Sequence, residues 1–164
     1  MLRYIDLMSR WSGKVTSWLI LPLIFELVYD TVARYAFNAP TPWSYDISYM
    51  LYGTLFMLGA PYTLLVDEHI RVEAFYEKAS RRGRAILDII GYLLFFFPSV
   101  GALFWFGLDF AWEAWKARET SITFWAPPIY PLKALIPIVA LMLLLQGLAR
   151  FLRDIHLAFT GREL

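Results

Sequence analysis

The residues of this chain best suited to chemistry lie inside an apolar run, where charged side chains are rare. Glu26, Asp30 and Arg34 follow one another at intervals of four residues within the run 15–37. On a helix this spacing places all three side chains on one face. A carboxylate in such surroundings can make a structural contact within a helical bundle, bind a proton or a substrate, or contact the helices of a partner. The sequence leaves these three interpretations open, with the structural contact favoured.

Other kinds of reactive centre find no support in the sequence. Both histidines, His69 and His156, fall outside the apolar runs, which argues against a buried bis-histidine haem site. The chain has no cysteine, so disulfides, iron–sulfur clusters and thiolate chemistry are excluded. No spacing of His, Asp and Glu matches a metal site, and no glycine loop or Ser/His/Asp set indicates an enzyme. We therefore expect neither catalysis nor a bound cofactor.

The elements that must hold these residues are predicted from the alternation of apolar and charged stretches. Of the 164 residues, 59% are hydrophobic and only 18% are charged, too few charges to cover the surface of a soluble domain. In the stretch Asp67–Arg84, by contrast, nine of 18 residues are charged. We therefore predict an all-α integral membrane protein, a single membrane domain over 1–164, with 67–84 as an aqueous loop.

Four transmembrane helices are predicted, at about 15–37, 42–66, 85–111 and 131–151, with an outer loop over 112–130. Thr41 followed by Pro42 is typical of an N-cap and a first helical residue, so the second helix is expected to begin there. Each span also contains one interior proline, which predicts a kink. These prolines are Pro22, Pro61, Pro98 and Pro137.

Residues 1–14 are too polar to cross a bilayer. Their apolar side chains recur at helical spacing, at Leu2, Ile5, Met8 and Trp11, with charged residues on the other faces. This pattern favours a short amphipathic helix lying in the headgroup region, with a frayed basic tail as the alternative.

The distribution of Lys and Arg predicts the orientation of the chain. With the N-terminus inside, the segments on the cytoplasmic side hold eleven of them. The outer segments hold only four, which are Arg34, Lys116, Arg118 and Lys133. Because basic residues are retained on the cytoplasmic side, both termini and the loop 67–84 are predicted to be cytoplasmic.

Several short motifs occur in a fixed order between residues 30 and 150. They are Arg34-Tyr-Ala-Phe-Asn38-Ala-Pro40, then Trp43 and Asp46, then Gly59-Ala60-Pro-Tyr62, then His69-Ile-Arg71-Val72-Glu73, then Glu119-Thr-Ser121 and Pro131-Leu-Lys133. This ordered set resembles the small membrane subunit of the tripartite ATP-independent periplasmic (TRAP) transporters, the DctQ type. Asp46 stands where that family usually has glutamate and Glu73 where it usually has aspartate, and both keep the charge.

The resemblance implies a small scaffold subunit of a sodium-coupled secondary transporter in the cytoplasmic (inner) membrane of a bacterium or archaeon. It implies a large multi-span permease subunit, which carries the substrate and sodium sites, and a periplasmic binding protein that delivers an organic acid. No nucleic acid is expected among the partners. In such a subunit Glu26, Asp30, Arg34, Asn38, Trp43 and Asp46 are expected at the interface with the large subunit or in structural polar contacts. His69, Arg71 and Glu73 form a cytoplasmic loop motif, and Glu119, Ser121 and Trp125 are expected to contact the binding protein.

Two other classes of protein are weighed against this one. A small multidrug exporter also has four helices and a membrane-embedded glutamate in the first, as Glu26 would be. The length of the chain, its large central loop and its charge bias argue against an exporter. A membrane enzyme or redox subunit is disfavoured because the chain lacks cysteine and its histidines fall outside the spans.

Overall fold

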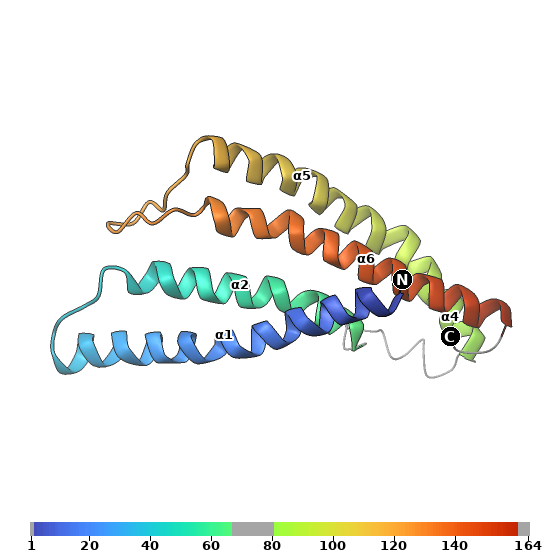
Figure 1. Ribbon diagram of the computed structural model, residues 1–164, viewed down its shortest axis with the longest axis horizontal. Coiled ribbons are helices and arrows are strands. Elements are labelled where there is room, and N and C mark those ends of the chain that lie inside the picture. The colour runs from blue at the N-terminus through green and yellow to red at the C-terminus, as the bar shows by residue number, and fades with distance from the viewer. Residues whose placement is uncertain (1, 67–80, 161–164) are drawn as a thin grey trace.

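The computed structural model describes residues 2–66 and 81–160, and its elements there are helices. They are α1 (Leu2–Ala36), α2 (Ser44–Leu65), α4 (Arg81–Gly91), the π-helical η1 (Tyr92–Phe96), α5 (Phe97–Lys116) and α6 (Tyr130–Thr160). Figure 1 shows two antiparallel hairpins, one of α1 and α2 and one of α4–α5 and α6. Helix α6 packs against α5, α2, α4 and α1, so it is the element that joins the hairpins.

The described ends of the chain share one end of the bundle. The loops 37–43 and 117–129 lie together at the left of Figure 1, while the start of α1 and the end of α6 lie towards the right. This arrangement follows from two hairpins set side by side. A polar link between the loops can therefore tie the hairpins at one end, and a link between α1 and α6 can tie them at the other.

Helix α1 differs from the prediction at its N-terminal end. Residues 2–14 are helical, as their spacing predicts, but they are not a separate element, because α1 runs unbroken from Leu2 to Ala36. Ser9, Ser12 and Gly13 are buried within the bundle. A Cβ added at Gly13 would stand 2.4 Å from Cγ of Tyr62 on α2. These small residues let the first turns pack against neighbouring helices instead of standing apart as an interfacial segment.

Three helices of the described ranges are long and apolar enough to cross a membrane, by length and composition: Leu2–Ala36, Gly83–Lys116 and Tyr130–Thr160. Helix α2 has 22 residues, about 33 Å of helix, which suffices in length. It is not among the three by composition, and its sequence includes four tyrosines, two serines and Asp46. All three crossing candidates extend beyond the spans expected from the sequence.

The proline of the third span is accommodated by a π-helical turn. Pro98 has no N–H for the carbonyl of Leu94, and its ring would clash with that carbonyl in a regular α-helix. The chain widens into η1 over Tyr92–Phe96, and the Phe97 N–H donates to Tyr92 O instead. Such single π turns within α-helices are often found at functional sites. Here the turn lets the helix continue through a proline.

Helix α2 begins later than predicted. Its N-cap is Trp43, whose carbonyl accepts from the Ile47 N–H at 3.1 Å, so Thr41 and Pro42 lie before the helix. The N-cap prediction for Thr41 is wrong because the Thr41 side chain bonds to Asp30 of α1 instead. Helix α1 ends at Ala36, Asn38 follows with a φ of 50°, and the Ala39 N–H donates to Ala33 O at 3.0 Å. This is a Schellman-type ending, in which asparagine tolerates the left-handed conformation.

Candidate functional site

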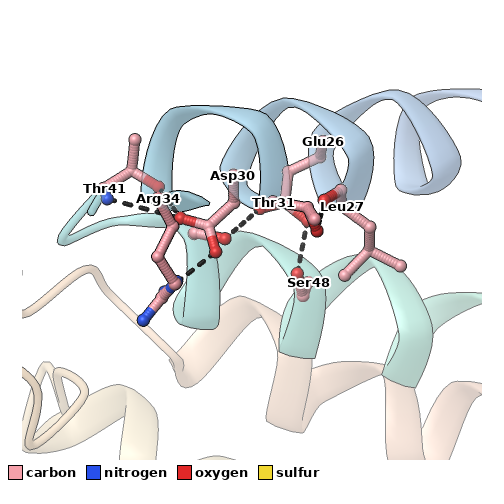
Figure 2. A network of polar contacts seen from close by, with 8 residues as sticks. Glu26, Leu27, Asp30, Thr31, Arg34, Thr41 and Ser48 are labelled. Atoms are coloured by element: carbon pink, nitrogen blue, oxygen red, sulfur yellow. Dashed lines mark hydrogen bonds and ion pairs between the residues drawn. The ribbon is translucent and has the colours of Figure 1, made fainter. Parts of the chain in front are cut away.

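The acidic stripe predicted on the first span is present and turns towards α2. Glu26 is 5% exposed and lies between the two helices. Ser44 donates to its Oε1 at 2.5 Å, and Ser48 donates to its Oε2, towards which Figure 2 shows it pointing. The serines lie four residues apart, so one face of α2 supplies both donors. The carboxylate of Glu26 is thereby satisfied inside the chain.

One turn further along, Asp30 holds the loop between α1 and α2. Thr41 donates to Asp30 Oδ1 through both its hydroxyl and its backbone N–H, the latter at 3.3 Å. Arg34 donates to Oδ2 at 2.8 Å, and Figure 2 shows these groups converging on Asp30. This carboxylate therefore fastens the chain where it leaves α1 and turns back. Trp43 in the same turn stacks on Tyr29, with ring centroids 5.8 Å apart.

Asp46 connects the two hairpins at the loop end. It is 3% exposed and sits in the first turn of α2. Ser121 donates to its Oδ1 at 2.7 Å, and Thr123 donates to its Oδ2 at 2.5 Å. Both donors come from the loop between α5 and α6, more than 70 residues later in the chain. We call Asp46, Ser121 and Thr123 the loop-end clamp.

The loop 117–129 is further held at its base. Lys133 of α6 donates to both carboxylate oxygens of Glu119, at 2.7 and 2.6 Å, and its Nζ lies 4.1 Å from the ring centroid of Phe110. Antiparallel bonds close the loop, from the Ser121 N–H to Pro127 O and from the Ile129 N–H to Glu119 O. The loop is thus a short, fixed projection rather than a loose connection.

The predicted contact residues for a binding protein divide into two groups in this loop. Glu119 and Ser121 are bonded within the chain, whereas Trp125 is 46% exposed. Ile122 and Phe124 at the loop tip are almost fully exposed, and the sequence reasoning did not single them out. Their exposure could have been predicted from the sequence, because two large apolar residues in a short segment next to prolines are typical of an exposed contact surface.

A second clamp joins the hairpins at the opposite end. Ser9 of α1 donates to Oε1 of Gln146 of α6 at 2.8 Å, and Nε2 of Gln146 donates to Asp6 at 3.2 Å. Arg153 completes the group with a 2.5 Å contact to the other oxygen of Asp6. We call Asp6, Ser9, Gln146 and Arg153 the terminal clamp. Its sequence signal is Gln146, a lone amide within an apolar run.

The remaining predicted residues are placed as follows. Asn38 lies just after the end of α1 and is exposed. His69, Arg71 and Glu73 of the loop motif lie outside the described residues. Within the described ranges, no group of three or more His, Cys, Asp or Glu side chains is placed to hold a metal ion.

Long apolar helices joined by buried polar clamps define an α-helical membrane protein whose acidic groups serve internal contacts. The comparison with known families gives the particular kind. Residues 23–157 match the family described as tripartite ATP-independent periplasmic transporters, DctQ component. This match covers most of the chain, which therefore belongs to the DctQ family and is a membrane component of a TRAP transporter. No curated protein and no solved structure matches the chain.

Proposed function

We propose that this protein is the static scaffold subunit of a sodium-coupled TRAP transporter that imports an organic acid. In this proposal a large permease subunit carries the substrate and sodium sites, and a periplasmic binding protein delivers the solute. The protein has no catalytic activity and binds no cofactor of its own. It lies in the cytoplasmic membrane and gives the permease a fixed surface against which its moving part works.

The observation that carries the scaffold proposal is the internal use of buried acidic side chains. Glu26 is bonded by two serines of α2, and Asp46 by two hydroxyls of the loop 117–129. A carboxylate that must bind and release a solute or a coupling ion needs an exchangeable site, whereas these are held by fixed donors of the same chain. Clamps at both ends of the hairpin pair favour rigidity, which a support needs.

The proposed topology has four membrane crossings with both termini in the cytoplasm. The described ends of α1 and α6 lie towards the same end of the bundle, which an even number of crossings requires (Figure 1). The excess of basic residues in the segments at that end favours the cytoplasmic side for it. Helix α2 counts as the fourth crossing in this proposal because it pairs with α1 along its length and has the necessary reach.

Reconstitution tests the scaffold role directly. The purified chain alone in liposomes should show no sodium-driven uptake, while the chain with its permease and binding protein should show uptake of the solute. The matched control is the permease with binding protein but without this chain, which should be inactive or unstable. Uptake or export of a solute by the lone chain would instead support the exporter, with Glu26 as its binding residue.

A further inference from the structure

One carboxylate in the described helices stands apart from the others. Glu26, Asp30 and Asp46 are each bonded within the chain, but Asp109 on α5 is exposed. In the ranges that the structure describes, its side chain has no hydrogen-bond or ion-pair partner. It lies seven residues before Lys116, the end of α5, which is about 10 Å along the helix. Asp109 lies inside the outer end of the predicted span 85–111, and ionisable side chains within spans usually face protein or water rather than lipid.

The surroundings of Asp109 are aromatic and hollowed. A depression of about 500 Å³ lies where α5 meets α6, and its lining includes Asp109, Trp112, Trp115, Ala134, Pro137 and Ile138. Trp112 already holds one cation over its ring, since Lys116 Nζ lies 5.2 Å from the ring centroid. That lysine is engaged by Glu113 at 3.3 Å. A carboxylate beside indole rings is a setting that stabilises a second, incoming cation.

The same face of α5 is shaped to receive a helix. Gly101, Trp105, Asp109 and Trp112 follow one another at intervals of four, four and three residues, and Leu108 lies three residues after Trp105 and four before Trp112. These residues therefore share one side of α5, here called the Asp109 face. A Cβ added at Gly101 would meet no atom within 4 Å, so the backbone there is open to a close neighbour. Glycine on an open helix face permits close approach of another helix, which a lipid chain does not need.

We infer that the Asp109 face is the surface on which the large permease subunit packs, and that Asp109 receives an arginine or lysine side chain from it. This inference rests on the proposed function. It moves the principal polar contact with the partner from the stripe on α1 to α5. The stripe has partners within its own hairpin, whereas Asp109 has a negative charge that a basic side chain complements.

Co-purification tests the inference in the assembled complex. The tagged chain is expressed with its permease, extracted in mild detergent, and the permease retained per tagged chain is measured. Asp109→Asn should lower retention at least tenfold. Asp109→Lys should lower it further, because the new lysine would repel the basic side chain of the permease. Glu113→Gln is the matched control, since Glu113 is another exposed carboxylate of α5 that pairs only with Lys116 in the described residues; its retention should stay within twofold. Because Asp109 is exposed, each purified variant should keep the helical circular dichroism and melting temperature of the wild type.

Each outcome bears on a different statement. A wild-type chain that retains no permease overturns the proposed function and the inference with it. A wild-type chain that retains permease, while Asp109→Asn retains as much, overturns the inference alone. Loss of bound phosphatidylethanolamine from Asp109→Asn without loss of permease assigns the carboxylate to a lipid amine and also overturns it. If an acidic substitution of one basic permease residue restores permease retention by Asp109→Lys, that residue is the partner of Asp109.

Discussion

Gln146 of α6 accepts a hydrogen bond from Ser9 of α1 across 137 positions of the sequence, at 2.8 Å and with both residues almost fully buried. The bond is part of the terminal clamp that includes Asp6 and Arg153. It joins the first turns of the chain to its last helix and so closes the bundle at the end away from the loops. The strength of this closure can be measured by removing one hydroxyl.

Ser9→Ala should destabilise the purified chain by about 1–2 kcal/mol, because Gln146 loses its donor in a buried position. Ser17→Ala is the matched control on the same helix, since the Ser17 hydroxyl bonds only to its own helix at Gly13 O, and its effect should stay within about 0.5 kcal/mol. The measurement is reversible unfolding in mixed detergent micelles followed by circular dichroism. Equal effects of the two substitutions would contradict the clamp.

Glu26 gives a second prediction, which separates a structural from a transport role. Glu26→Gln should keep most uptake by the complex, because the amide can still bond to Ser44 and Ser48, whose hydroxyls rotate to donate or accept. Glu26→Leu leaves both buried hydroxyls without their acceptor and should cost about 1–3 kcal/mol of stability. Uptake and complex assembly are measured together. Complete loss of uptake by a fully assembled Glu26→Gln complex would point to proton or substrate binding.

The loop-end clamp predicts that a change of Asp46 speeds amide hydrogen exchange in the loop 117–129, which is far from Asp46 in the sequence but in contact with it. In Asp46→Ala, the amides of Ser121 and Ile129 should exchange faster, because Ser121 and Thr123 lose the acceptor that holds the loop against α2. Asp46→Asn keeps one acceptor and should give an intermediate rate. Glu113→Ala, an exposed change near the same loop, should leave both rates at the wild-type value. Unchanged exchange in Asp46→Ala would show that the loop is held by its own bonds alone.

The orientation can be tested with single cysteines, because the chain has none of its own. Ile122→Cys at the loop tip and Phe159→Cys near the end of α6 are both at highly exposed positions, so accessibility within the protein does not limit labelling. In intact cells an impermeant maleimide should label position 122 and spare position 159, and permeabilised cells should label both. The reverse pattern would place the termini outside.

Two glycines provide a matched pair for packing. A Cβ at Gly147 would stand 2.2 Å from Cε1 of Phe96, whereas one at Gly101 would meet no atom within 4 Å. Gly147→Ala should therefore destabilise the isolated chain by about 1–3 kcal/mol, and Gly101→Ala should stabilise it by up to about 1 kcal/mol through helix propensity. In the complex with the permease, Gly101→Ala should instead weaken retention, because the Asp109 face loses its close approach. If Gly101→Ala raises both the stability of the isolated chain and the retention of the permease, Gly101 does not lie at the interface.

The sequence predicted the helices and the shared face of Glu26, Asp30 and Arg34 because both depend on local periodicity. It did not predict which groups donate hydrogen bonds to the two carboxylates on that face. Ser44 and Ser48 come from the next helix, and Thr41 follows a strong local N-cap pattern that a longer-range bond to Asp30 overrides. Helix-start propensity is worth about 1 kcal/mol, which a buried carboxylate with hydroxyl donors can outweigh.

The clamps show the same limit of local patterns more clearly. Asp46 and Thr123 are 77 positions apart, and Ser9 and Gln146 are 137 apart, so no periodic signal relates them. Gln146 was visible as an exception within an apolar run, whereas Ser9 and Thr123 lie outside the predicted spans, where a hydroxyl is ordinary. The pairing within each clamp depends on how the helices are set against one another, which depends on small residues at helix contacts, such as Gly13 between α1 and α2, and on where each helix ends.

The π turn at Tyr92–Phe96 has a consequence for how this subunit can change in evolution or by design. Such a turn holds one residue more than an α turn, and each residue of an α-helix advances the chain by about 100°. Tyr92–Phe96 therefore acts as a rotational offset between α4 and α5. Deleting one residue there would leave the composition of both helices almost unchanged yet turn α5 by about 100° relative to α4. The direction in which Asp109 points therefore depends on the number of residues upstream, and an insertion or deletion in the π turn, 13 or more residues before Asp109, can change that direction without altering Asp109 or its neighbours.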